Sequence, residues 1–406
     1  IDFNAFQKGQ RAFTIEGIQP AGSPQISLQN SENCIEVMTG AVLPNNTNAV
    51  IRYEDVEIKN GVARVTINEV LDFQNIHEKG KDRKVGDVLI NKNKIISAAE
   101  IGVLATVGKS LIKVAKLPKV MILSTGDELV GVDQKPKDHQ IRRSNIFTLV
   151  SLLERINIPS EIAHITDDKS VLKEKVAGFL KDYDVLLCSG AVSKGKFDFL
   201  PEVFDELGVK KLFHRISQRP GKPFWMGETN TCKVFAFPGN PVSTFVNCLV
   251  YFYPWFYKSN GVEISEETAI LTEDVIFKPN LTYFLQVKLS DKYGHLLASP
   301  VKGNGSGDLA SLVNADAFIQ LPKDQTEFKK GETFSFIRYI IFSFQFFVLL
   351  RMFQVDIAYY DAIIAISTMY LLASIIPSIF ILDVVVKGSV AVYVFSLLEI
   401  NDREDF

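Results

Sequence analysis

The sequence STGDEL at residues 124–129 is the first of four turns on which the fold of this chain depends; the others are SGAVSKGKFD at 189–198, RPGKP at 219–223 and FPGNPVS at 237–243. An apolar run suited to a buried parallel strand precedes three of them, at residues 120–123, 185–188 and 234–237. Because open parallel sheets bind ligands beyond the carboxyl ends of their strands, we expect these turns to converge on one site. Small residues there let backbone N–H groups approach an anion. The pattern therefore predicts a ligand that carries phosphate.

Strand and helix patterns alternate around these turns, from residue 118 to residue 258. Ser144 and Asp167 are the expected N-caps of the first two helices. Regular alternation of this kind predicts an α/β fold with a parallel sheet covered by helices on both faces. Helices are expected over 144–156, from 167, over 198–207 and over 241–257, and strands at 161–165, 183–188, 210–216 and 234–237.

The flanking regions read mainly as strands and turns. The KNG sequence at 59–61 predicts a hairpin turn between the β-type runs 49–57 and 61–67, and a short helix is expected over 97–107. Later strands are expected at 268–277, 283–289, 295–300 and 317–321. The glycine-rich GNGSGD at 303–308 could suit a phosphate, but a tight connection is the favoured interpretation. We expect four regions: a β-rich part over 1–117, an α/β domain over 118–258, a second β-rich domain over 262–338 and a hydrophobic tail over 339–406.

Bulk properties exclude several classes of protein. A net charge of −3 gives no reason to expect nucleic-acid binding, and the four dispersed cysteines predict free thiols in the cytoplasm and no zinc site. In the tail, residues 362–382 carry no formal charge and are long enough to span a bilayer, although Pro377 interrupts them. A membrane anchor is one interpretation; a remnant of another gene, fused by a frameshift or an assembly error, is favoured, because hydropathy shows only what could insert. Membrane contact is expected only if the tail is genuine.

Two aspartates could hold a hard cation at the strand ends. Asp127 follows the first apolar run, and Asp198 ends the second turn. Carboxylates there can bind a divalent ion that bridges phosphate or oxyanion oxygens, whereas the alternative role of each is to cap the adjoining turn or helix.

Positive charge is expected at the same edge. Lys222 lies between Gly221 and Pro223 in a stiff turn that suits an oxyanion contact, and Lys194 and Lys196 lie in the second turn. Any one of these lysines could instead be a solvated surface charge. The sequence shows neither a Ser-His-Asp arrangement nor a Walker loop, so nucleotide binding without an NTPase signature is what we expect.

Taken in this order, the four turns resemble the molybdopterin-binding domain of MoeA-type molybdopterin molybdenumtransferases, the family that includes the catalytic domain of gephyrin. The sequence VMTGA at 37–41 with Pro44 is similar to the family's inserted β domain. The segment from residues 303–308 to Leu321 and Pro322 is similar to the family's C-terminal domain. The resemblance covers about residues 1–338. It implies a three-layer, parallel-sheet molybdopterin-binding domain between a β-rich inserted domain and a C-terminal β-barrel, followed by a hydrophobic helical tail from outside the family.

The resemblance also implies an activity. Members insert molybdenum from molybdate into adenylyl-molybdopterin and release AMP, with a divalent cation such as Mg²⁺; a homodimer is expected, and a molybdopterin adenylyltransferase would act upstream. At matching positions the catalytic candidates are Asp127, Asp198 and Lys222, the first two also being metal ligands. The candidates for lining the pterin and nucleotide site are Thr125, Gly126, Ser189, Gly190, Ser193, Pro220, Gly221, Gly239, Asn240 and Pro241.

The chain departs from the family pattern in several places. The family's Asn-Ser-Ala-Met-Asp-Gly-Tyr-like motif lies before Ile1, so we expect an N-terminally truncated member with impaired activity. Lys196 stands where many members have Glu, which argues against acid–base chemistry at that position, and His77 stands where many have Arg. Residues 356–383 resemble a multi-pass lysylphosphatidylglycerol synthase-like membrane protein.

Two other functions are left open. A molybdopterin adenylyltransferase shares the central fold but is a compact single domain, whereas this chain has β-rich regions on both sides. A scaffold could keep the fold for docking a partner. The presence of Asp127, Asp198 and Lys222 favours chemistry.

Overall fold

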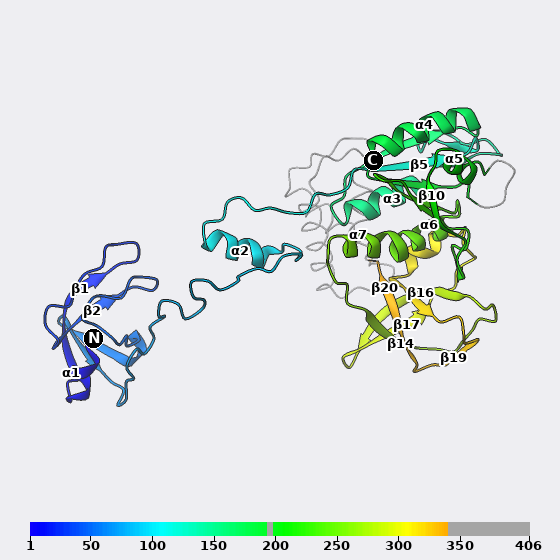
Figure 1. The fold of residues 1–406 in the computed structure, drawn as a ribbon. Coiled ribbons are helices and arrows are strands. Elements are labelled where there is room, and N and C mark those ends of the chain that lie inside the picture. Colours follow the sequence, from blue (N-terminus) through cyan, green and yellow to red (C-terminus); the bar gives the residue numbers. More distant parts are fainter. Residues whose placement is uncertain (193–197, 340–406) are drawn as a thin grey trace, which may run out of the picture. The chain divides into compact units, whose positions relative to one another are not determined.

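The computed structural model describes residues 1–192 and 198–339, which divide into two compact units (Figure 1). The first is Ile1–Lys92 and the second begins at Asn93. Ser193, Lys194 and Lys196 and the tail from residue 340, including its predicted membrane span, lie outside the described residues. Within the described ranges, no helix has both the length and the apolar character needed to cross a bilayer.

The first unit is a four-stranded sheet with one short helix. The strand order is β2-β1-β4-β3, and Phe13 is fully buried at the centre of its core. Asn60 and Gly61 both have positive φ, which confirms the predicted hairpin turn. The strand before it is shorter than expected, because Tyr53–Asp55 forms a 3₁₀ turn. The elements are α1 (Phe3–Gln7), β1 (Ala12–Gln19), β2 (Asn33–Val37), β3 (Val56–Lys59) and β4 (Val62–Val65).

The second unit begins with α2 (Ala98–Thr106), close to the expected helix. Its first turn has a capping box, in which the Ser97 hydroxyl accepts from the Ala99 N–H and Glu100 accepts from the Ser97 N–H.

The central sheet of the second unit has six strands in the order β10-β12-β13-β9-β5-β8. The four strands β13, β9, β5 and β8 are parallel, as the alternating pattern predicted, whereas β12 runs antiparallel to both β13 and β10. The bounds are β5 (Val120–Thr125), β8 (Ser160–Ile165), β9 (Val185–Ser189), β10 (Lys210–His214), β12 (Trp225–Glu228) and β13 (Lys233–Phe237), with a small pair β6 (Leu129–Val130) and β7 (Ile141–Arg142) after β5.

Helices cover both faces of this sheet and give two separate hydrophobic cores (Figure 1). One core contains α3 (Asn145–Glu154) and α6 (Pro241–Asn247), and the other contains α4 (Lys169–Asp182) and α5 (Leu200–Glu206). Alternate residues along each strand point to opposite faces, so Val185 and Leu187 enter the first core and Leu186 and Cys188 the second. This arrangement confirms the three-layer α/β prediction.

Of the two predicted N-caps, Ser144 occupies the predicted position before α3, whereas Asp167 does not cap α4. The Asp168 carboxylate, not that of Asp167, caps α4 by accepting from Ser170 N and Val171 N at 2.8 and 3.0 Å. Ser144 has a helical backbone and makes no side-chain capping bond.

The expected helix over 241–257 contains a wider turn. α6 runs into a π-helical turn, η2 (Cys248–Phe252), before α7 (Tyr253–Ser259). Pro254 cannot donate a backbone hydrogen bond to the preceding turn, which accounts for the local widening.

The C-terminal part is a closed β-barrel. The strand order is β11-β16-β17-β14-β20-β18, and an additional pairing of β16 with β18 closes the ring. The region expected as one strand over 268–277 is divided into β14 (Glu267–Leu271) and β15 (Val275–Ile276). The remaining strands are β11 (Gln218–Arg219), β16 (Thr282–Lys292), β17 (His295–Pro300), β18 (Ala317–Leu321), β19 (Glu327–Phe328) and β20 (Thr333–Arg338). The short strand β11 belongs to the α/β segment of the chain, so its pairing with β16 ties the barrel to the RPGKP turn.

Candidate anion-binding active site

Three of the four turns meet at the carboxyl edge of the sheet. The Asn145 side chain, at the start of α3, donates from Nδ2 to Ser189 Oγ at 2.8 Å and to the Gly239 carbonyl at 2.7 Å. It thereby joins the turn after β9 to the turn after β13. Sequence reasoning missed Asn145, and its only local signal is a polar residue at a helix start.

Glycines let the same turns approach one another closely. Gly190 has a φ of 100°, and its N–H donates to the Phe237 carbonyl at 3.1 Å. A Cβ added at Gly190 would lie 3.4 Å from the Thr125 carbonyl, and one added at Gly239 would lie 3.6 Å from the Gly190 Cα. Thr125 Oγ1 is buried here and has no hydrogen-bond partner among the described residues. The turns after β5, β9 and β13 therefore form one surface with backbone and hydroxyl groups.

Three aspartates gather at the β5 side of this surface. Asp127 Oδ1 accepts from the Asp167 N–H at 3.2 Å. Burial raises the pKa of the Asp167 carboxyl, and the nearby carboxylates of Asp127 and Asp198 raise it further. Among residues 1–192 and 198–339, no three His, Cys, Asp or Glu side chains form a ready metal cluster. Mg²⁺ commonly takes one or two protein carboxylates and completes its shell with water and substrate phosphate, so Asp127 and Asp198 fit its donor chemistry.

A histidine is also brought to this edge by strand pairing. Ser189, Ser124 and His164 occupy matching positions on the adjacent strands β9, β5 and β8. Ser124 Oγ lies 3.0 Å from His164 Nδ1, and burial and Arg143 lower the pKa of His164. Ser124 is only 2% exposed, so this pair is a buried polar contact and not an accessible nucleophile.

A cavity of about 510 Å³ lies between the RPGKP turn, the turn after β13 and the barrel. Its described lining includes Arg219 and Lys222 and contains neither Asp nor Glu. A concave site with two cations and no carboxylate favours an anionic ligand.

The barrel contributes the glycine-rich loop to this cavity. Gly303, Gly305 and Ser306 line it, although sequence reasoning favoured a simple connection for this loop. Asn240 Nδ2 donates to Ser306 Oγ at 2.8 Å, and the Val242 N–H donates to the Ser306 carbonyl at 3.0 Å. The loop is thus attached to the start of α6.

The predicted site residues therefore fall into two adjoining groups. Gly239 and Asn240 connect them, because Gly239 is held by Asn145 at the sheet edge and both residues line the cavity. Pro241 is the first residue of α6, and Ser193 lies outside the described residues. The group at the sheet edge is Thr125, Gly126, Asp127, Ser189 and Gly190. Asp198 belongs with this group, because its charge and that of Asp127 both raise the pKa of Asp167. The group at the cavity is Pro220, Gly221 and Lys222.

We expect Gly221→Ala to lower the free energy of unfolding by about 1–3 kcal/mol. Gly221 has a φ of 96°, and an added Cβ would lie 2.4 Å from Asn247 Oδ1. Gly208→Ala is the matched control, because Gly208 also has positive φ, 70°, but has no atom within 4 Å of the added Cβ. Urea unfolding would measure both variants. Equal losses of stability would contradict the crowding at Gly221.

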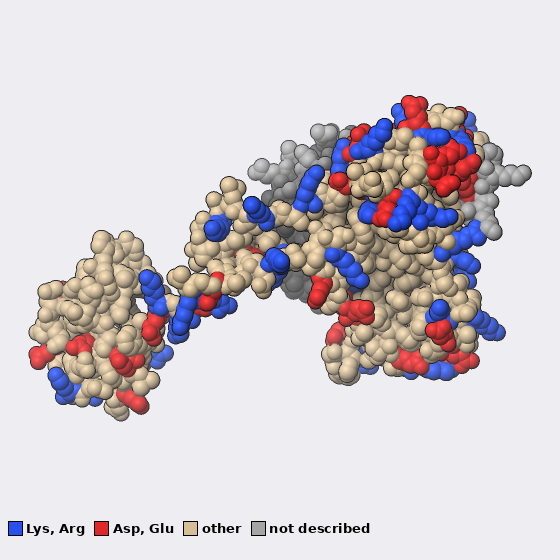
Figure 2. All heavy atoms as spheres, viewed as in Figure 1, with Lys and Arg blue, Asp and Glu red and all other residues tan. Residues whose placement is uncertain are grey.

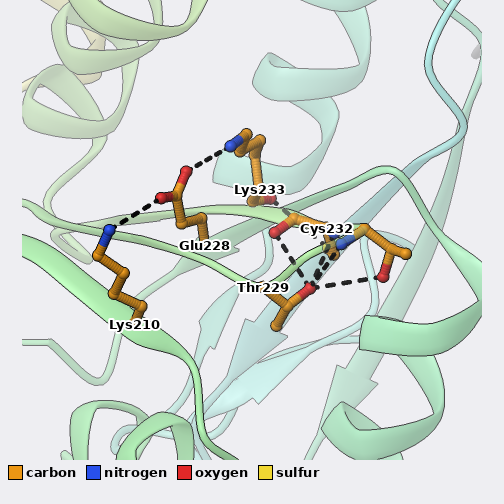
Figure 3. Close-up of polar contacts among 6 residues, drawn as sticks. Lys210, Glu228, Thr229, Cys232 and Lys233 are labelled. Atoms are coloured by element: carbon orange, nitrogen blue, oxygen red, sulfur yellow. Dashed lines mark hydrogen bonds and ion pairs between the residues drawn. The ribbon is translucent and has the colours of Figure 1, made fainter.

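Other charged clusters are neutralised within the fold. Around α4 and α5, where Figure 2 shows acidic and basic side chains side by side, Lys169 pairs with Glu202 and Glu206 at 2.6 and 2.8 Å. In the β12–β13 hairpin, Glu228 lies between Lys233 and Lys210, and these partners lower its pKa (Figure 3). That hairpin is at the end of β13 opposite the cavity. In these two clusters each lysine has an acidic partner.

Comparison with protein families finds three matches in chain order. The MoeA N-terminal region (domain I and II) matches residues 2–108, a probable molybdopterin binding domain matches 121–257, and the MoeA C-terminal region (domain IV) matches 268–339.

Individual relatives match over most of their length. The molybdopterin molybdenumtransferase of Synechocystis sp. is 39% identical over 341 residues, which are 83% of this chain and 85% of that protein. The Bacillus subtilis protein of the same name is 32% identical over 310 residues, 74% of this chain and 71% of its own. The crystal structure of the molybdopterin biosynthesis MoeA protein from Pyrococcus horikoshii OT3 superposes with a TM-score of 0.68 at 26% identity and covers 81% of both chains.

Proposed function

The chain belongs to the MoeA family of molybdopterin molybdenumtransferases, and from this we propose that it inserts molybdenum from molybdate into adenylyl-molybdopterin with release of AMP. It is thus a transferase of molybdenum cofactor biosynthesis. One observation carries the finer proposal: a cavity with Arg219 and Lys222 and no acidic lining adjoins the glycine-rich edge of the sheet. Such a pair of neighbouring sites suits two anionic substrates that react with each other.

In this proposal the cavity holds molybdate. Lys222 and Arg219 neutralise its two negative charges, and cations that are fixed before the reaction stabilise developing charge without reorganisation. Lys222 is itself exposed, so it can reach the anion without leaving a buried position. Ser243 adds a hydroxyl to the lining.

The sheet edge would hold the pterin phosphate and its adenylyl group. Gly190 permits close approach of the backbone to phosphate oxygens, whereas the Glu128 carboxylate occupies the space beside the Gly126 Cα. The Thr125 hydroxyl and Ser189 supply polar contacts. Asp127 and Asp198 would hold Mg²⁺, which supplies charge neutralisation at the phosphoanhydride. Water cleaves the phosphoanhydride to give AMP and the phosphate of molybdopterin. The two dithiolene thiols replace one oxo group of molybdate, which leaves as water with their two protons, and molybdenum stays hexavalent.

The proposal also covers the oligomeric state, the upstream enzyme, the cell compartment and the domain limits. We propose a homodimer that receives its substrate from a molybdopterin adenylyltransferase and acts in the cytoplasm, where four free, buried cysteines are an ordinary feature. The domain limits 1–117, 118–258 and 262–338 belong to this proposal too. Equilibrium sedimentation of the chain that returned only monomer would contradict the dimer.

The proposed reaction is tested by separating nucleotides chromatographically. The purified chain is given adenylyl-molybdopterin and Mg²⁺ with or without molybdate, and AMP release that depends on molybdate is expected. A parallel incubation with ATP and molybdopterin tests the adenylyltransferase alternative. Pyrophosphate release there, without AMP release in the first assay, would overturn the proposed function.

A further inference from the structure

A buried polar network lies directly beneath the turn that carries Lys222. Asn247, in α6, is fully buried and donates from Nδ2 to the Gly221 carbonyl at 3.0 Å. Its Oδ1 accepts from Gln218 Nε2 at 2.6 Å. Gln218 Nε2 also donates to the Pro220 carbonyl, at 2.8 Å. The two carbonyls of the turn next to Lys222 are therefore each held by a side-chain amide.

Tyr251 completes this network from the π-helical turn. Its hydroxyl donates to Gln218 Oε1 at 2.5 Å, which leaves the Gln218 amide with a partner on each side. Burial raises the pKa of Tyr251 to about 12, so the hydroxyl remains a donor at neutral pH. Its ring stacks on Phe224 with centroids 4.7 Å apart, which restricts where the hydroxyl can point.

The network also meets the barrel. Gln218 belongs to β11, which pairs with Thr282 and Tyr283 of β16. On the far side of the turn, the Lys222 carbonyl accepts from the Ile216 N–H at 3.0 Å. The turn is thus fixed from beneath by α6 and η2, from one flank by the barrel and from the other by residue 216.

Such a network is costly unless every member is partnered. An amide or hydroxyl that is buried without a hydrogen bond loses its bonds to water and gains none in exchange, which lowers the stability of the fold. An apolar side chain of similar size would fill the same volume without this cost. Here hydrogen bonds give a partner to Asn247 Nδ2 and Oδ1, to Gln218 Nε2 and Oε1 and to the Tyr251 hydroxyl. The fully paired network at this one turn indicates a geometric requirement at Lys222.

We propose that Asn247, Gln218 and Tyr251 are positioning residues, which hold the backbone of residues 220–222 so that Lys222 meets the oxyanion in the cavity. The assignment rests on the proposed function, because it takes molybdate as the ligand of Lys222. Gln218 also lines the cavity, whereas Asn247 and Tyr251 are not among its lining residues. They act through the turn, and errors of about 1 Å in the placement of a reacting group can reduce rates by about 100-fold.

The test compares two neutral variants. Asn247→Leu keeps the approximate size but removes the partner of the Gly221 carbonyl and one of the two partners of Gln218 Nε2. Tyr251→Phe removes only the outermost hydroxyl. We expect the KM for molybdate to rise about tenfold in Asn247→Leu and about threefold in Tyr251→Phe. The KM for adenylyl-molybdopterin should stay within twofold of the wild-type value.

Val246→Ala is the matched control. Val246 is the fully buried neighbour of Asn247 and belongs to the apolar core on this face of the sheet. This variant should lower the thermal midpoint but leave the KM for molybdate unchanged. If it raises that KM as much as Asn247→Leu does, general destabilisation explains the effect and the assignment is overturned.

Hydrogen exchange gives a readout that does not depend on the reaction. The Ile216 amide is protected by its bond to the Lys222 carbonyl, so a displaced turn should speed its exchange about tenfold in Asn247→Leu and not in Val246→Ala. Unchanged exchange at Ile216 in both Asn247→Leu and Tyr251→Phe would overturn the proposal. If the wild-type chain releases no molybdate-dependent AMP, the proposed function fails, and the exchange result still decides whether these residues position the turn.

Discussion

Lys222→Met is expected to lower molybdate-dependent AMP release by about 100-fold, since removing one preorganised electrostatic contact from an active site typically has an effect of this size. The loss should appear mainly at low molybdate concentration. Lys222 is exposed and lines the cavity, so its replacement should shift the thermal midpoint little. Steady-state assays over a range of molybdate concentrations measure the effect.

Lys258→Met is the control for this change in charge. Lys258 is an exposed residue in the last turn of α7 and is not among the cavity residues. The Lys258→Met variant should release AMP at the wild-type rate at every molybdate concentration. Equal activity losses in the two variants would mean that net charge, and not the position of Lys222, governs the reaction.

Asp127→Asn is expected to reduce turnover by about 10- to 100-fold and to raise the Mg²⁺ concentration needed for half-maximal rate. Asparagine keeps an oxygen that can accept from the Asp167 N–H, so the local turn is preserved while the negative charge is lost. The variant therefore separates the metal-ligand role from the capping role. The measurement is a Mg²⁺ titration of AMP release.

Asp138→Asn is the matched control, because Asp138 is an exposed aspartate in the loop between β6 and β7. It should leave the Mg²⁺ dependence unchanged. Wild-type turnover in Asp127→Asn would show that Asp127 is only a cap. If the chain were a scaffold, Asp127→Asn would keep its affinity for a protein partner, and there would be no turnover to lose.

Local sequence patterns were sufficient to predict much of the central α/β fold. The apolar runs ending at Leu123, Cys188 and Phe237 are buried on both faces of the sheet, which is why they read as continuous hydrophobic segments. Strand β12, which lies between β10 and β13, was missed, because the sequence Trp225-Met226-Gly227-Glu228 is short and contains a glycine. The two-residue strand β11 was missed because its pairing with β16 is a tertiary contact.

The polar contacts of the site depend on longer-range geometry. Asn145 is separated from Gly239 by 94 residues, and Gln218 from Asn247 by 29, so neither contact leaves a local pattern. His164 reaches Ser124 because β8 and β5 pair in register. The turn residues themselves were predictable, because glycine and proline mark sharp turns directly in the sequence.

The most direct test of the central claim measures two products in one reaction. The chain is incubated with adenylyl-molybdopterin, molybdate and Mg²⁺, AMP is quantified by chromatography, and pterin-bound molybdenum is quantified by mass spectrometry after free molybdate is removed. We predict that AMP and molybdenum-loaded pterin form in equal amounts and that neither forms without molybdate. Release of AMP without incorporation of molybdenum, or no release of AMP, would contradict the account.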